Sequence, residues 1–345
     1  MEKKRTLIAL FCIIFVIASA VCIYQFTPAP QGEKSAEKLK IYTRNKPNAE
    51  ITVAVVSDNG TEIVAYGHDG ESIAVPDRSY EIGQITRTFT GAIAAEAYNE
   101  GYFSMDTPVS DVLTIARGAY SPSLFELLTH SSAYADYSPK VKKTNSANPY
   151  EGINGNDIVA EMNSFRLSFK PPYLYADSDF GTAVLGSAIS KIYDVDFYSI
   201  LTIFIQERLG LTHSFVALEK CTEDGWKWNN DDAYIASLGL TTNITDMVKY
   251  ANIYLNDRYS FLRTASDPLY EENADSSIGY MWNISKKGWV LSQSGETGHY
   301  SASIVIDKNS RIAVIVLSNY RNDRYGNTSD IAHTILDEKN GERPV

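Results

Sequence analysis

The segment Tyr80–Gly91 limits the possible folds more than any other part of this 345-residue chain. Gln84 and Arg87 stand three positions apart in it, on the same side of the expected helix. They belong either to a solvated helix face or to a cleft. Gly91 and the alanines around it favour close packing against a neighbouring element. Apolar residues recur at helical spacing and predict a face that packs against the core: Ile85, Phe89, Ala92 and Ile93.

The side chains of Gln84 and Arg87 exclude one kind of chemistry. A hydroxyl at the start of a helix, with an amine one turn later, can act as a nucleophile and its base. The amide of Gln84 is not a usable nucleophile. The guanidinium of Arg87 stays protonated at physiological pH and cannot accept a proton. This pair therefore cannot start an acyl transfer.

Further motifs along the chain carry a family resemblance. Together with Tyr80–Gly91 they resemble the serine β-lactamases and penicillin-binding proteins, especially the class C-like branch, over about residues 51–333. The fold that the resemblance implies is α/β, or α+β: an antiparallel sheet flanked by helices, with a mainly helical insertion. The segments that carry it are Glu100–Val109, Leu127–Ala133, Pro171–Gly181, Arg208–His213, Ser237–Asp246 and Ser292–Tyr300.

The same resemblance assigns cleft positions, and the catalytic motifs deviate at them. Gln84 stands at the nucleophilic serine and Arg87 at the lysine. Tyr175 matches the motif tyrosine, but Asp177 stands where asparagine is expected. The Lys-Thr-Gly or His-Thr-Gly triplet is replaced by Gln293, Ser294 and Gly295. Several deviations together favour a site that no longer acylates.

Arg87 and Asp177 are predicted to form an ion pair in this cleft. The resemblance puts their positions side by side, and a buried guanidinium without a partner is costly. We expect Tyr175 close to the pair. The alternative is that both groups point into water, where such a pair contributes at most about 1 kcal/mol.

Strand patterns at both ends of the chain suit a sheet completed by both termini. One hairpin is expected over residues 51–66, with Asn59-Gly60 as its turn, and another over residues 303–317. Residues 330–336 are expected to form a closing helix. The predicted body spans residues 41–340, with sheet parts at about 41–80 and 278–338 and a helical part at about 100–240.

The N-terminus predicts export from the cytoplasm. Basic residues precede an uncharged apolar run, Thr6–Tyr24, that is long enough to cross a bilayer. Residues 1–26 are therefore expected to be a membrane anchor with an external body, or else a cleaved signal segment ending near Ala18-Ser19-Ala20. A lipidated Cys22 is a weaker alternative. Residues 27–40, polar and Pro-containing, are expected to be a tether, and the chain before Ala36 dispensable for folding.

Charge and cysteine content limit the partners. The net charge of −11 argues against nucleic acid and against bulk attraction to anionic wall polymers. Cys221 is the one cysteine of the predicted body, so no disulfide is expected within it. The histidines show no metal-ligand spacing and are read as packing or surface residues. We expect no metal and no cofactor.

Three functions remain open from the sequence. The first is a membrane-anchored, extracytoplasmic pseudoenzyme that binds a peptide, a cell-wall-derived ligand or a protein partner. The second is an active serine-hydrolase-family enzyme, a D-alanyl-D-alanine carboxypeptidase or an esterase, with a rearranged site. The third is a scaffolding module whose cleft is closed.

Overall fold

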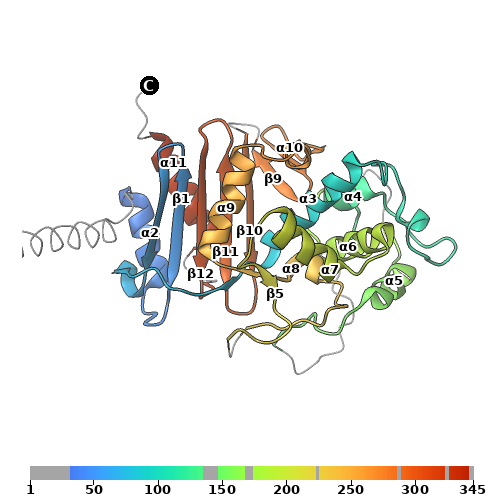
Figure 1. Cartoon of the computed structure of the whole chain (residues 1–345), viewed down its shortest axis with the longest axis horizontal. Coiled ribbons are helices and arrows are strands. Elements are labelled where there is room, and N and C mark those ends of the chain that lie inside the picture. The colour runs from blue at the N-terminus through green and yellow to red at the C-terminus, as the bar shows by residue number, and fades with distance from the viewer. Residues whose placement is uncertain are drawn as a thin grey trace, which may run out of the picture.

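An antiparallel sheet and a mainly helical part lie side by side in the molecule (Figure 1). The computed structural model describes residues 32–134, 147–167, 174–222, 225–285, 289–322 and 326–341. Within these residues the large sheet has nine strands in the order β3-β2-β1-β12-β11-β10-β9-β8-β7. Their bounds are β1 Ile51–Ser57, β2 Gly60–Tyr66, β3 Ser72–Ile73, β7 Tyr270–Glu271, β8 Ser276–Gly279, β9 Trp282–Ser285, β10 Val290–Glu296, β11 Ser301–Asp307 and β12 Ile312–Ser318.

Both ends of the chain complete this sheet, as the strand patterns predicted. β1 pairs with β12 in antiparallel register, with Val53 opposite Val316. Both predicted hairpins are present, as β1–β2 and β11–β12. The first turn differs in register by one residue. Ser57 pairs with Gly60, so Asp58 and Asn59 form the turn and Gly60, at φ +127°, begins β2.

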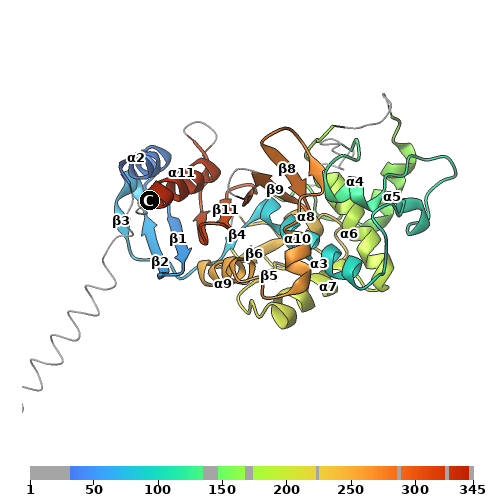
Figure 2. The same cartoon turned by 90° about the horizontal axis from the view of Figure 1, so that it is seen from above.

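Helices α2 (Glu33–Thr43) and α11 (Thr328–Gly341) lie side by side on one face of the sheet (Figure 2). The tether expected at residues 27–40 is therefore wrong from Glu33 onward. Leu39 and Tyr42 are buried under the helix, against the sheet. Glu338 of α11 accepts hydrogen bonds from backbone N–H groups of the first turn of α2, including that of Lys34 at 3.1 Å. Tertiary packing and this cap make the polar segment helical.

Helix α9 (Ile244–Leu255) packs against the opposite face of the sheet, and the other helices form the second part of the molecule (Figure 2). The bounds of these helices are α3 Thr86–Asn99, α4 Leu124–Leu128, α5 Gly155–Ser164, α6 Asp179–Tyr193, α7 Phe197–Ile203, α8 Ile235–Leu238 and α10 Ser260–Ala265. Short helical turns are η1 His68–Gly70, η2 Gly83–Ile85, η3 Val109–Asp111 and η4 Phe204–Arg208. A small sheet pairs β4 (Tyr80–Glu81), β6 (Leu240–Thr242) and β5 (Phe215–Val216).

The expected α+β architecture is confirmed, and so is the closing helix within α11. The sheet begins earlier than expected in its second half, at Tyr270 of β7 rather than near residue 278. The apolar run Thr6–Tyr24 lies outside the described residues. Among the helices that the structure does describe, none is long and apolar enough to span a bilayer.

Candidate functional site: a polar cavity at the start of helix α3

Two glycines let the backbone just before α3 pack directly against the backbone of strand β10. Gly83 adopts φ +50°, and a Cβ there would lie 2.4 Å from the backbone N of Glu296. A Cβ on Gly295 would lie 2.0 Å from the carbonyl oxygen of Ile82. Larger residues at either position would push the two segments apart. The sequence thus fixes where Gln84 meets the strand.

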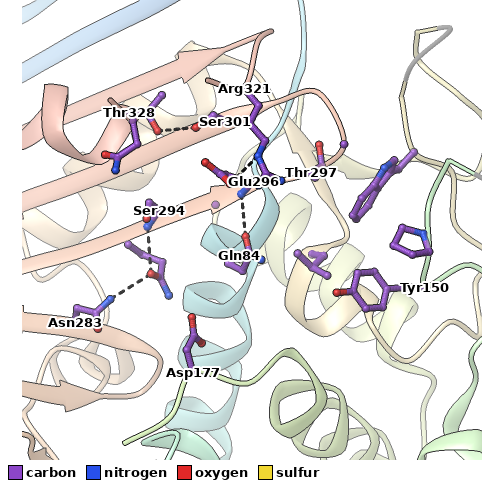
Figure 3. Close-up of a pocket in the computed structure, with 17 residues that line it drawn as sticks. Gln84, Tyr150, Asp177, Asn283, Ser294, Glu296, Thr297, Ser301, Arg321 and Thr328 are labelled. Atoms are coloured by element: carbon purple, nitrogen blue, oxygen red, sulfur yellow. Dashed lines mark hydrogen bonds and ion pairs between the residues drawn. The ribbon is translucent and has the colours of Figure 1, made fainter. Parts of the chain in front are cut away.

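Gln84 uses its side chain to occupy a backbone donor at this junction. Its Oε1 accepts a hydrogen bond of 2.8 Å from the backbone N–H of Glu296 (Figure 3). Both residues line the same cavity. A backbone N–H that faces a cavity can hold a carbonyl oxygen or an oxyanion. Here the protein supplies that oxygen itself.

Arg87, the second residue of α3, lies beneath the cavity and is 2% exposed. Its Nε donates to Ser237 Oγ at 3.0 Å. One terminal nitrogen pairs with Asp177 and the other with Asp179 Oδ1 at 2.5 Å. Ser237 also donates to Asp179, which closes the network. The predicted ion pair with Asp177 is confirmed, and it is half of a two-carboxylate clamp.

The charges in this network hold each other in the ionised form. Burial alone would lower the pKa of Arg87, but the carboxylates of Asp179 and Asp177 outweigh it and raise that pKa. Burial would raise the pKa of the Asp177 carboxyl, but the charge of Arg87, together with the neighbouring His130 and the hydrogen bonds to the carboxylate, holds that pKa below its usual value. Arg87 therefore cannot release its proton to a reacting group.

His130 lies against the same network, where the sequence suggested only a packing or surface residue. It is 3% exposed, and its Nε2 lies 3.8 Å from Asp177 Oδ1. Its ring meets the edge of Tyr175 at a centroid distance of 6.0 Å. Burial, and then the charge of Arg87, lower the pKa of His130 to about 4. The imidazole is thus neutral at physiological pH.

The cavity beside Gln84 has a volume of about 570 Å³. Strand β10 forms one wall, and Asp177 enters from the side of the helical part (Figure 3). Tyr150 and Trp226 stand at one end with their ring centroids 6.0 Å apart. The residues that line the cavity are Gln84, Pro149, Tyr150, Asp177, Trp226, Leu238, Asn283, Gln293, Ser294, Gly295, Glu296, Thr297, Gly298, Ser301, Arg321, Asn327 and Thr328.

Hydrogen bonds and an ion pair fix most polar groups along β10. Gln293 donates through Nε2 to the carbonyl of Met281 at 3.2 Å and accepts through Oε1 from Asn283 at 3.3 Å. Glu296 pairs with Arg321 Nε at 3.0 Å (Figure 3). The Gln293 amide is therefore engaged in hydrogen bonds within the sheet. The position that holds a basic or imidazole side chain in the family motif carries a neutral amide here.

The structure brings most of the residues selected from the sequence to one place. Gln84, Asp177, Gln293, Ser294 and Gly295 line the cavity. Arg87 lies beneath it, and Tyr175 stands behind Asp177, outside the set of residues that line the cavity.

Other residues of the site were not selected from the sequence: Tyr150, Asp179, Trp226, Ser237, Glu296 and Arg321. Asp179 and Ser237 do fall inside segments that carry the resemblance, and this position in the sequence could have marked them as candidate site residues. Glu296 directly follows the Gln-Ser-Gly triplet. Tyr150 and Arg321 have no such signal.

Comparison with known proteins decides the family. The family model described as Beta-lactamase matches residues 47–335. The chain belongs to the beta-lactamase family. It is 24% identical over 219 residues to a Beta-lactamase of Providencia stuartii, covering 59% of this chain and 54% of that protein. It is 21% identical over 254 residues to a Beta-lactamase of Pseudomonas fluorescens, covering 67% and 65%. The aligned region thus spans less than two thirds of each relative.

Solved structures of the beta-lactamase family share this fold. A class C beta-lactamase from Rhodobacter sphaeroides superposes with a TM-score of 0.70 at 16% identity, over 89% of this chain and 98% of the other. An octameric penicillin-binding protein homologue from Pyrococcus abyssi superposes with a TM-score of 0.69 at 19% identity, over 90% and 76%. The resemblance first seen in the motifs is thereby confirmed at the level of family and fold.

Proposed function

We propose that this beta-lactamase-family protein is a pseudoenzyme that binds a peptide or a cell-wall-derived ligand in the cavity beside Gln84 without being acylated. The hydrogen bond between Gln84 Oε1 and the N–H of Glu296 carries the proposal. The nucleophile position holds an amide, and that amide occupies the donor that would polarise a bound carbonyl.

The charges around Arg87, which stands where the family has its lysine, support the same proposal. Arg87 is clamped between Asp177 and Asp179 and keeps its proton. Ser294 presents the exposed hydroxyl of the β10 triplet, and among the described residues no hydrogen bond joins its Oγ to a base. An active hydrolase with a rearranged site would need such a contact.

An open polar cavity favours ligand binding over a scaffold with a closed cleft. Its volume of about 570 Å³ lies within the usual range for small-molecule sites. We propose that the body acts outside the cytoplasm, joined to the membrane through residues 1–26, because the basic and apolar pattern of that segment favours this placement.

Intact-mass spectrometry after incubation with a penicillin and with an ester substrate tests the proposal. We expect no mass increase, since no group at position 84 or 87 can form an acyl bond. A mass increase matching one bound β-lactam, located in the Tyr80–Gly91 peptide, would reject it. Thermal unfolding with candidate peptides is the complementary measurement, because a ligand that binds the native state raises its stability.

A further inference from the structure

The charges of the residues that line the cavity indicate which charged group of a ligand it can bind. Among the described residues that line it, the ionised side chains are Asp177, Glu296 and Arg321, so two negative charges face one positive charge. Arg87 and Asp179 behind the wall cancel each other. His130, the neighbouring imidazole, is neutral because burial lowers its pKa to about 4. The wall that the described residues form is therefore net negative.

The groups that would attract an anion are already engaged. The backbone N–H of Glu296 is bonded to Gln84 Oε1 at 2.8 Å. Arg321 is held by the Glu296 carboxylate at 3.0 Å. A carboxylate entering the cavity would have to displace both contacts and approach Asp177, which costs desolvation and repulsion.

A cation meets the opposite situation. Asp177 is 55% exposed, and only one of its oxygens pairs with Arg87, so the carboxylate can still accept hydrogen bonds from the cavity. The Tyr150 and Trp226 rings line one end of the same cavity. Aromatic rings attract an ammonium through their negative faces. A carboxylate and an aromatic wall together suit a primary amine.

We propose that the cavity selects the primary ammonium group of its ligand and rejects a free carboxylate. Asp177 holds the ammonium, and Glu296 keeps Arg321 from holding a carboxylate. The inference rests on the proposed binding function and adds the chemistry of the ligand. The ammonium can come from the amino end of a peptide or from a lysine-type side chain, since both present the same three donors.

Two matched probes test the preference: alanyl-alanine amide, which has an ammonium and no carboxylate, and N-acetyl-alanyl-alanine, which has a carboxylate and no ammonium. Isothermal titration of the purified body at pH 7 and low salt should give the amide a dissociation constant at least about tenfold lower. Added salt should reduce the ratio, because the preference is electrostatic. Nα-acetyl-lysine amide then reports whether a side-chain ammonium serves equally, and binding of either cationic probe supports the proposal.

Single substitutions assign the preference to residues. Glu296→Gln removes one negative charge without touching the Arg87 clamp, and it should abolish most of the tenfold ratio. Asp177→Asn should do the same if the variant folds. Gln84→Ala frees the backbone donor of Glu296, so the acetylated probe should gain affinity. Asp106→Asn removes an exposed charge outside the cavity and should leave the ratio unchanged.

The possible results distinguish between the ammonium preference, the binding function and the assignment to Asp177 and Glu296. Tighter binding of the acetylated probe would overturn the ammonium preference and leave a binding cavity in place. No binding of any of the three probes would overturn the preference and the proposed function together. An ammonium preference that both Glu296→Gln and Asp177→Asn leave intact would overturn the assignment to these carboxylates.

Discussion

Arg87 has two carboxylate partners that differ in their exposure to solvent. Substituting each one separately shows how much it contributes to the stability of the folded protein. Asp179 is 13% exposed and also accepts from Ser237, whereas Asp177 is 55% exposed. We expect Asp179→Asn to lower the free energy of unfolding by on the order of 3 kcal/mol, because it strips charge compensation from a buried guanidinium. Asp177→Asn should cost about 1 kcal/mol, since solvent replaces much of what it loses. Urea unfolding of both variants measures this. Equal losses, or a larger loss for Asp177→Asn, would contradict the ranking.

His130 gives a second prediction for a single residue, through pH. Its folded-state pKa of about 4 lies below the ordinary 6.5, so between these values the unfolded chain binds a proton that the folded protein does not. Stability should therefore fall as pH decreases from about 6.5 to about 4, by up to about 3 kcal/mol from this group. The groups around the imidazole are Arg87, Asp177, Asp179 and Tyr175.

Chemical denaturation of the parent and of His130→Gln across this pH range checks the effect. The substitution should flatten the pH dependence by the amount assigned to the imidazole. A parent slope that survives in His130→Gln would show that other groups cause it.

At the scale of elements, the sequence predicts those parts whose pattern is local. The hairpin strands were predictable because continuous runs of β-branched and apolar residues end at turn residues, and α3 because apolar residues recur at helical spacing. Gly91 also packs as expected: a Cβ there would lie 2.0 Å from the carbonyl oxygen of Tyr280. The helix α2 was missed because its first turn is capped by Glu338, about 300 residues away in the chain. Long-range contacts of this kind leave no local pattern.

Helix α2 also supplies a prediction for an element. A chain that begins at Gly32 keeps the helix and its cap, and should unfold with the parent's midpoint and slope. A chain that begins at Arg44 loses buried Leu39 and Tyr42, and should lose on the order of 4 kcal/mol, the cost of uncovering two large apolar contacts on the sheet. Urea unfolding of the two truncations decides this. The earlier expectation that everything before Ala36 is dispensable gives way to a boundary at Gly32, because Ser35 is already buried in the helix.

At the scale of the whole molecule, the question is whether restoring two family residues would restore acylation. We predict that Gln84→Ser combined with Arg87→Lys forms no adduct with a β-lactam. A lysine at position 87 would face the carboxylates of Asp177 and Asp179, which favour its charged form and raise its pKa. An ammonium that keeps its proton cannot activate a hydroxyl one turn away. The strand that should complete the site still carries Gln293, whose amide is bound to Met281 and Asn283. Intact-mass measurement of the folded double variant after incubation with a penicillin tests this, and thermal unfolding verifies that it folds. An acyl adduct at position 84 would show that two substitutions alone separate this protein from an acylating relative.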